Sequence, residues 1–269
     1  MTNSITIREK IRSFDKKIKV SGDKSISIRW VLFSSVANGT SVARNLLQSE
    51  DVLAAINAIK KLGIKVNLNK DSCKVFGKGI NGFKYNKNLI INAENSGTLA
   101  RLILGFLIDT PFPIKLIGDE SLSKRDFKRI SDPLSKFGAS FKLHNDKNLP
   151  LTIKGSSELK PFRYFEKRGS AQCKSAVIFG AMRANGATVI KAKKSRNHTE
   201  LLGKYLKLPL KIKKKKNYDL IEIKKVNKIK PLNYKIPSDI SSGAFFIVLT
   251  ALSNNSKLLI KDVNINPSR

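Results

Sequence analysis

Lysine, serine and arginine stand together at one predicted helix start near the N-terminus. Lys24 and Ser25 follow a Gly22-Asp23 turn and precede an apolar run, so a cation, a hydroxyl and free backbone N–H groups meet there. Helix starts of this kind favour anions. Arg29 follows one turn later and can lie over the same face. The stretch predicts an anion site, and the alternative is an ordinary surface helix start with basic residues.

A second polar helix start covers residues 95–101. Gly97 lets the backbone approach a ligand, Asn95 and Thr98 can hydrogen-bond to it, and Arg101 follows one turn later. A turn before a further helix carries Arg125, whose planar guanidinium matches phosphate or carboxylate. The alternative for this second helix start is a simple helix cap.

A third helix start reads Ser170, Ala171 and Gln172, which offers hydrogen bonds rather than charge. The loop before the next helix, residues 195–200, contains Ser195, Arg196, His198 and Glu200. His198 and Glu200 could form a catalytic pair. We favour the alternative that Thr199 is an ordinary helix N-cap.

These polar stretches recur because the chain is a tandem repeat. Gly22, Gly97 and Gly169 each precede an apolar helical run, at residues 27–36, 98–107 and 170–181. A turn and a strand follow each run, and then an amphipathic helix that stops at Gly63, Gly138 or Pro209 before another strand. The nearly constant spacing predicts three similar α/β units whose helix starts gather at one site.

A fourth copy begins at residues 237–242 and continues through an apolar run to a strand at 257–260. The second helix and closing strand of the other units are missing from it. We therefore expect one face of this unit to be uncovered and the chain to be truncated at its C-terminal end, the alternative being a naturally short terminal unit.

Composition narrows the class of protein. The 269 residues are 41% hydrophobic, which is enough for a sizeable core. The sequence shows neither a membrane span nor a secretory signal, so we expect a cytoplasmic protein. Cys73 and Cys173 lack the spacing of a zinc site and are expected as interior free thiols. No cofactor or metal is expected.

The formal net charge of +32 raises the possibility of a nucleic-acid-binding protein. The lysines are spread over the whole chain, and aromatic residues are not interleaved with them as in single-strand binders. We attribute most of the charge to solvated surface and the rest to a field that attracts anionic substrates. Nucleic acid is therefore an unfavoured partner.

Taken in order, these motifs resemble the 5-enolpyruvylshikimate-3-phosphate (EPSP) synthase family along essentially the whole chain. The matching motifs are Gly-Asp-Lys-Ser-Ile-Ser-x-Arg (22–29), Asn-Ser-Gly-Thr-x-x-Arg (95–101), Gly-Asp-Glu (118–120), Lys-Arg (124–125), Ser-Ala-Gln (170–172), Ser-Arg-Asn-His-Thr-Glu (195–200) and Pro-Ser-Asp-Ile-Ser-Ser (237–242). The resemblance implies tandem βαβαββ units in a two-domain α/β (α+β) fold. Residues 20–229 would form one complete domain, and residues 1–19 with 230–269 would form part of a second, discontinuous domain.

The resemblance also implies an activity, the transfer of the carboxyvinyl group of phosphoenolpyruvate to the 5-hydroxyl of shikimate 3-phosphate, a step of the shikimate pathway of aromatic amino-acid biosynthesis. Lys24 would contact both substrates and be the catalytic residue of this chain. The shikimate 3-phosphate site would comprise Lys24, Ser25, Arg29, Ser170, Ala171, Gln172, Ser195 and Arg196. The phosphoenolpyruvate site would comprise Lys24, Asn95, Gly97, Thr98, Arg125 and Gln172.

Two departures from the family pattern matter. Ile28 stands where the family often has histidine, which we expect to alter packing more than binding. The acid–base carboxylates of the family lie beyond Arg269, and Asp239 belongs to an earlier motif. We therefore expect a monomeric enzyme as the full-length protein but negligible turnover by this chain. The related enzyme alternative, UDP-N-acetylglucosamine enolpyruvyl transferase, is unfavoured because residues 118–126 contain no cysteine.

Overall fold

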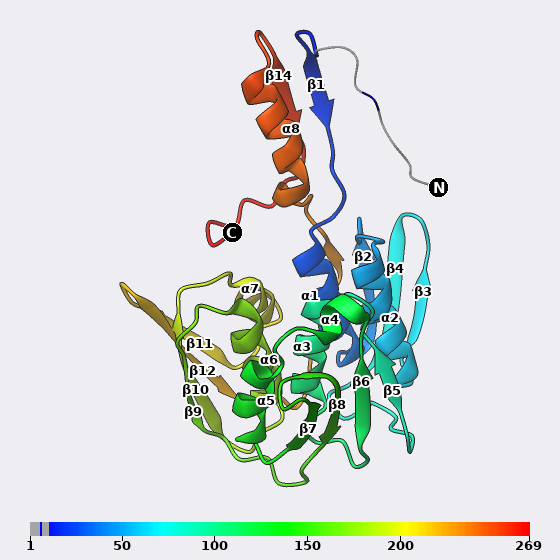
Figure 1. Ribbon diagram of the computed structural model, residues 1–269, viewed down its shortest axis with the longest axis vertical. Coiled ribbons are helices and arrows are strands. Elements are labelled where there is room, and N and C mark those ends of the chain that lie inside the picture. Colours follow the sequence, from blue (N-terminus) through cyan, green and yellow to red (C-terminus); the bar gives the residue numbers. More distant parts are fainter. Residues whose placement is uncertain (1–5, 7–10) are drawn as a thin grey trace.

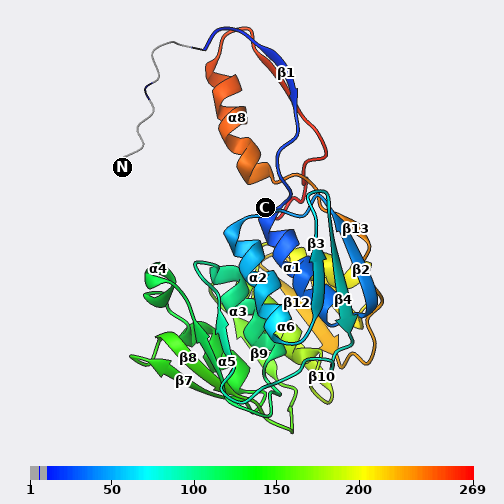
Figure 2. The same ribbon diagram turned by 90° about the vertical axis from the view of Figure 1, so that its right-hand side faces the viewer.

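A body of three α/β units and a smaller lobe make up the structure, a computed structural model that describes residue 6 and residues 11–269 (Figures 1 and 2). The three predicted helical runs are α1, α3 and α6, each the first helix of its unit. The first unit comprises α1 (Lys24–Ser35), β2 (Asn38–Arg44), α2 (Glu50–Lys61), β3 (Lys65–Leu68) and β4 (Ser72–Lys78).

The second and third units repeat this order. The second comprises β5 (Ile90–Asn92), α3 (Gly97–Phe106), β6 (Ile114–Ile117), α4 (Glu120–Ser123), α5 (Lys128–Ser135), β7 (Ser140–His144) and β8 (Asn148–Lys154). The third comprises β9 (Arg163–Glu166), α6 (Ala171–Ala181), β10 (Ala187–Lys193), α7 (His198–Tyr205), β11 (Leu210–Lys214) and β12 (Tyr218–Lys224). The tandem α/β repeat predicted from the spacing is confirmed.

The three units have four-stranded sheets with the same arrangement of strands. The strand orders are β5-β6-β8-β7 and β9-β10-β12-β11 in the second and third units. The first two strands of each order are parallel and are joined through a helix, and the remaining neighbours are antiparallel. A parallel pair needs such a crossover, which places the helix over one face of its sheet.

The first unit takes its outer strand from a distant part of the chain. Its sheet has the order β13-β2-β4-β3, where β13 (Tyr234–Lys235) pairs parallel to β2. In turn β1 (Asp15–Ile18), which precedes α1 in sequence, pairs parallel to β14 (Lys257–Ile260) in the lobe. The strands that precede α1 and α8 (Ile240–Leu252) are thus exchanged between body and lobe, so the chain crosses the junction twice.

The predicted division into two domains stays a prediction, and residues 1–5 and 7–10 lie outside the described part of the chain. Residues 232–236, which we expect to belong to the second domain, pack on the body. Trp30 Nε1 donates a hydrogen bond to the Leu232 carbonyl at 2.9 Å, and Leu232 and Ile236 are fully buried.

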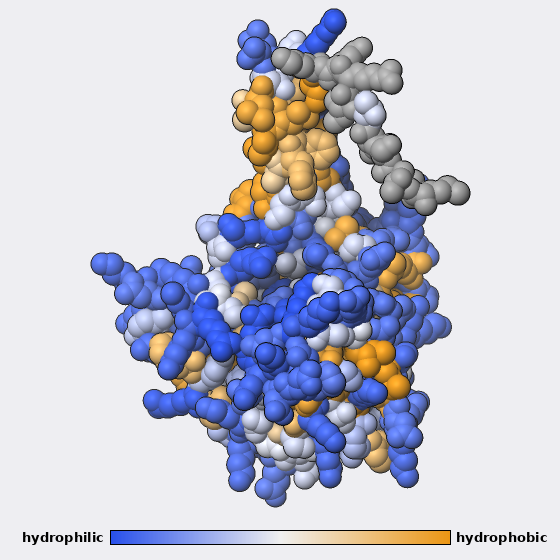
Figure 3. All heavy atoms as spheres, viewed as in Figure 1, coloured by the Kyte–Doolittle hydropathy of each residue, from blue (hydrophilic) through white to orange (hydrophobic). Residues whose placement is uncertain are grey.

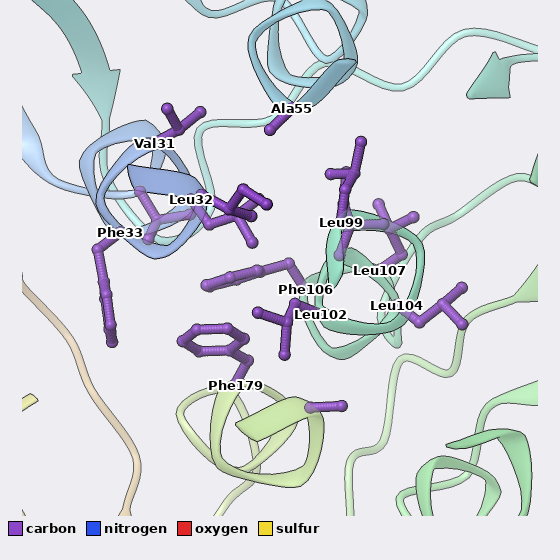
Figure 4. Packing of buried hydrophobic residues seen from close by; sticks show 14 of the residues in the cluster. Val31, Leu32, Phe33, Ala55, Leu99, Leu102, Leu104, Phe106, Leu107 and Phe179 are labelled. Atoms are coloured by element: carbon purple, nitrogen blue, oxygen red, sulfur yellow. The ribbon is translucent and has the colours of Figure 1, made fainter. Parts of the chain in front are cut away.

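The core of the body lies between the first helices of the three units (Figure 4). Phe33 of α1, Phe106 of α3 and Phe179 of α6 are fully buried. The rings of Phe106 and Phe179 stack with centroids 4.4 Å apart, and Phe33 meets Phe179 edge-on at 5.0 Å. Each such side chain contributes about 1.5–3 kcal/mol by burial. The shared core holds the three helix starts in fixed relative positions.

The lobe carries an exposed apolar surface. Figure 3 shows hydrophobic side chains gathered over α8, where Phe245 and Leu252 are 80% and 81% exposed. An uncovered face on the fourth unit, as expected from its sequence, is confirmed. No helix in the described residues is long and apolar enough to cross a membrane. Cys73 and Cys173 are buried free thiols, as predicted.

Candidate active site

Polar side chains fix the starts of the three central helices. Asp23 caps α1 by accepting from the backbone N–H of Ile26 at 3.0 Å, and Ser170 caps α6 by accepting from Cys173 at 3.2 Å. Ser96 caps α3 in the same way. Caps leave the next backbone N–H groups pointing outward, and the helix dipole makes these ends attractive to anions.

Direct contacts between the helices show that their starts adjoin. Gln172 at the start of α6 donates from Nε2 to Thr98 Oγ1 of α3 at 3.0 Å and accepts from Arg101 Nη1 at 2.8 Å. Ser175, one turn further along α6, accepts from Arg29 Nη2 of α1 at 3.3 Å. The first turns of α6 therefore join the motifs of the first and second units, as the repeat predicts.

Gly97 lies between two guanidinium groups. A Cβ built on it would stand 2.9 Å from Arg101 Nη1 and 3.0 Å from Arg125 Nη1. Arg125 Nη2 also donates to Asn95 Oδ1 at 3.2 Å, and Asn95 Nδ2 donates to Asp119 Oδ2 at 2.5 Å. Asn95, Gly97, Thr98, Arg125 and Gln172, predicted from separate motifs, thus form one cluster together with Arg101.

Arg29 is held by oxygen atoms of three segments. Its Nε donates to Thr199 Oγ1 at 2.7 Å, Nη1 donates to the Ser25 carbonyl at 3.0 Å, and Nη2 contacts Ser175. The residue is 3% exposed. Burial lowers the pKa of Arg29 to about 10, with the charge of Glu200 acting in the opposite direction. The guanidinium is therefore still charged at neutral pH.

Two buried arginines in the site lack a carboxylate partner. Among the described residues, neither Arg29 nor Arg101 forms an ion pair, and Arg101 Nε is buried without a hydrogen-bond partner. Burial lowers the pKa of Arg101 to about 10, and the cations Arg129 and Arg125 add to that effect. Buried charge without a partner is costly, so the site is built to receive an anion.

The other predicted site residues surround these arginines. Lys24 Nζ lies 2.8 Å from Asp51 Oδ2 and is half exposed, and Ser25 lies beside it at the start of α1. Ala171 is the first residue of α6. Arg196 is exposed, whereas Ser195 Oγ is buried and has no hydrogen-bond partner in the part of the chain that the structure describes. Ile28 is fully buried, consistent with a packing role.

The favoured interpretation of residues 198–200 is wrong. Thr199 is not a cap, because α7 begins at His198 after Asn197, whose side chain makes no capping bond. Thr199 instead accepts from Arg29. The pairing of His198 with Glu200 is not observed either, because the Glu200 carboxylate lies 2.6 Å from Lys174 Nζ and His198 Nε2 lies 3.5 Å from Asn264 Nδ2.

Sequence reasoning missed Ser175 and Thr199 as partners of Arg29. Ser175 gave no signal beyond a hydroxyl inside an apolar helix, a position where serine competes with the backbone and needs a partner. Within the described ranges, no group of three or more His, Cys, Asp or Glu side chains could hold a metal ion.

Comparisons with known proteins agree with this geometry. The sequence profile of EPSP synthase (3-phosphoshikimate 1-carboxyvinyltransferase) matches residues 8–269. The chain belongs to the EPSP synthase family. It is 41% identical to the 3-phosphoshikimate 1-carboxyvinyltransferase of Caldicellulosiruptor saccharolyticus over 271 aligned residues, which cover 100% of this chain and 61% of the relative. With the enzyme of that name from Leuconostoc mesenteroides it shares 39% identity, over 94% of this chain and 57% of the relative.

The fold comparison leads to the same family. The structure matches EPSP synthase from Acinetobacter baumannii with a TM-score of 0.87 and 33% identity, covering 96% of this chain and 57% of that one. The predicted enolpyruvyl-transferase-like fold is therefore confirmed. The chain spans about 60% of the length of the curated EPSP synthases that it resembles. These matches favour neither the UDP-N-acetylglucosamine enzyme nor a nucleic-acid-binding protein.

The close fit around Gly97 leads to a prediction. In Gly97→Ala the new methyl group displaces the ends of Arg101 and Arg125, which are flexible, so the free energy of unfolding changes by less than about 1 kcal/mol. Anion binding at the cluster weakens by about tenfold, because one charge-assisted hydrogen bond is lost. Titration calorimetry with inorganic phosphate as the anion measures the change. Gly203→Ala is the control, since its Cβ would meet only leucine side chains.

Proposed function

We propose that this chain forms the substrate-binding part of an enzyme that transfers the carboxyvinyl group of phosphoenolpyruvate to the 5-hydroxyl of shikimate 3-phosphate and releases phosphate. The observation that carries the proposal is the pair of buried guanidinium groups, Arg29 and Arg101, which lie at adjoining helix starts and have no carboxylate partner among the described residues. Both substrates are anions, and fixed cations and backbone N–H groups stabilise the charge that develops during such a transfer.

The two arginine clusters support a division of the site between the substrates. Arg29, with Lys24, Ser25, Ser170, Ala171, Gln172, Ser195 and Arg196, would hold shikimate 3-phosphate. The hydroxyl of Ser195, which makes no hydrogen bond to any described residue, would donate to an oxygen of that ligand. Arg125, with Lys24, Asn95, Gly97, Thr98 and Gln172, would hold phosphoenolpyruvate. Gln172 touches residues of the second cluster and lies one helical turn from Ser175, so it would line both halves.

We also propose that the full-length protein is a cytoplasmic monomer. Lys24 would be the catalytic residue of this chain, as the family resemblance implies, and its ammonium group at the start of α1 lies 2.8 Å from Asp51 Oδ2. The proton-transferring carboxylates implied by the family resemblance are not among these 269 residues. The chain alone should therefore bind substrate weakly and release no phosphate.

Ligand-dependent unfolding tests the proposal. Shikimate 3-phosphate should raise the melting temperature of the chain in proportion to its occupancy, and unphosphorylated shikimate should have less effect, because a ligand that binds only the folded state stabilises it. Arg29→Met should abolish the response, whereas the exposed Arg168→Met should preserve it. Salt-dependent binding to random duplex DNA without any effect of shikimate 3-phosphate would instead support the nucleic-acid alternative.

Phosphate release tests the second part of the proposal. With both substrates present, a coupled phosphate assay on the chain alone should stay at background. Ordinary turnover in that assay would disprove the assignment of acid–base catalysis to residues outside this sequence.

A further inference from the structure

Next to Arg29, two adjacent residues of α6, Lys174 and Ser175, pair with two adjacent residues of α7, Thr199 and Glu200. Lys174 Nζ lies 2.6 Å from Glu200 Oε1, and Ser175 Oγ lies 2.7 Å from Thr199 Oγ1. The Lys174 and Glu200 side chains are 0% and 3% exposed. The buried region therefore contains one ion pair and one hydroxyl pair side by side.

Of these four residues, Arg29 contacts only the two of the hydroxyl pair. Its Nε and Nη2 atoms reach Thr199 and Ser175, which are the direct neighbours in sequence of Glu200 and Lys174. Glu200 is close enough for its charge to raise the pKa of Arg29 against the effect of burial. The carboxylate nevertheless pairs with Lys174, and Arg29 forms no ion pair in the described structure.

Two buried cations, Lys174 and Arg29, thus lie near the Glu200 carboxylate, and only Lys174 pairs with it. A carboxylate beside two cations in a region of low dielectric pairs with whichever it can reach, and that pairing lowers the net charge left for a ligand. Lys174 is fully buried and cannot reach a ligand, whereas Arg29 lies on the second turn of α1 at the proposed site. Pairing Glu200 with Lys174 leaves the positive charge at the residue that can use it.

The ion pair is incompletely hydrogen-bonded within the described residues. Lys174 Nζ and Glu200 Oε2 are both buried and make no hydrogen bond with any described residue, although Nζ lies at ion-pair distance from Oε1. Glu200 could therefore accept a hydrogen bond from Arg29 if Lys174 no longer held it.

We infer that Lys174 is a positioning residue that retains Glu200 and thereby keeps the Arg29 guanidinium available to an anionic substrate. The choice of shikimate 3-phosphate as that substrate rests on the proposed function, but the charge arrangement does not.

A pair of variants tests the inference through the affinity for shikimate 3-phosphate. Lys174→Met should weaken binding by about tenfold, because Glu200 then occupies the Arg29 guanidinium and one charge-assisted hydrogen bond to the ligand is lost. Lys174→Met/Glu200→Gln, which alters the same buried positions more extensively, should restore binding to within about threefold of the wild type. A purely structural role of Lys174 predicts no rescue, so equal affinity of the single and double variants would overturn the inference.

A second measurement decides the inference without depending on the substrate. In a crystal structure of Lys174→Met, the Glu200 carboxylate should lie within ion-pair distance, about 4 Å, of the Arg29 guanidinium. A carboxylate that stays away from Arg29 would overturn the inference.

If Lys174→Met does not fold, the double variant alone decides it, because a loss of about tenfold or more in its affinity would mean that Glu200 itself holds Arg29 in place. A wild-type chain that does not respond to shikimate 3-phosphate contradicts the proposed function instead, and the crystal structure still tests Lys174.

Discussion

Replacing Arg183 by methionine should lower the free energy of unfolding by about 3 kcal/mol, because it breaks a buried charge pair and frees a buried carbonyl. Arg183 follows α6 in the third unit, and its side chain is 4% exposed. Its Nε donates to Asp109 Oδ2 of the second unit at 2.7 Å, and Nη1 donates to the Ile80 carbonyl of the first unit at 2.5 Å. One side chain therefore ties all three units together, at the end of the central helices away from the proposed site.

The size of this effect follows from the partner left behind. Asp109 is 25% exposed, so water compensates part of the lost pairing and the loss should fall at the lower end of the range of about 3–5 kcal/mol for a broken buried pair. Urea unfolding at neutral pH measures it. Arg183→Lys should recover part of the stability, since a lysine restores the charge but not the bond to both units.

A surface ion pair provides the control for Arg183. Lys124 and Glu120 lie 2.5 Å apart but are 73% and 85% exposed, so Lys124→Ala should change stability by less than about 1 kcal/mol. An Arg183→Met variant as stable as Lys124→Ala would show that the three units are held by their apolar core alone.

The repeat could be predicted from the sequence because its signals are local. Gly63, Gly138 and Pro209 are helix stop signals, and the apolar runs after Gly22, Gly97 and Gly169 recur at nearly constant spacing. The spacing therefore predicted α1, α3 and α6, and with them the gathering of their starts.

The strand exchange could not be predicted in this way. Nothing in the two residues of β13 indicates that they pair with Ala43 and Arg44, which lie about 190 positions earlier. Pairing between distant strands is decided by which edges the folded units leave open, and an alternation of residue types does not record that choice.

The site shows the same limit at the level of side chains. Arg29 could be predicted as an anion ligand from its position after a helix start, whereas Arg101 was noted only as lying one turn after the second helix start. The surroundings that leave both charges without an ion pair in the described residues could not be predicted. For Arg29, those surroundings depend on the ion pair between Lys174 of α6 and Glu200 of α7, which keeps the Glu200 carboxylate from Arg29. No sequence motif indicates this contact between two helices of the third unit. The position of a polar residue on a helix can be predicted from the spacing of residues in the sequence. Its burial and its partners depend on how the helices pack in the folded chain.

His198 should make the folded chain less stable as the pH falls below about 6.5. Burial, and next the charge of Arg29, lower the pKa of His198 from 6.5 to about 4, with Asp23 opposing and Arg269 and Arg196 adding to the decrease. The unfolded chain therefore binds a proton that the folded chain refuses as the pH drops below 6.5. The free energy of unfolding should decrease by about 2–3 kcal/mol between pH 6.5 and pH 4 from this group alone, and the loss is complete below pH 4.

The difference between wild type and His198→Gln isolates this contribution, since the carboxylates that also titrate in this range are shared by both proteins. The free energy of unfolding of His198→Gln should rise relative to that of the wild type as the pH falls from 6.5 to 4. Above pH 6.5 the difference between the two proteins should stay constant. His144→Gln is the matched control, because His144 is exposed at the end of β7, and its curve should run parallel to the wild type. A flat difference curve for His198→Gln from pH 6.5 to 4 would mean that the imidazole takes up its proton in the folded state. Asp23, the cap of α1, would then have to outweigh the burial and the three arginines around the ring.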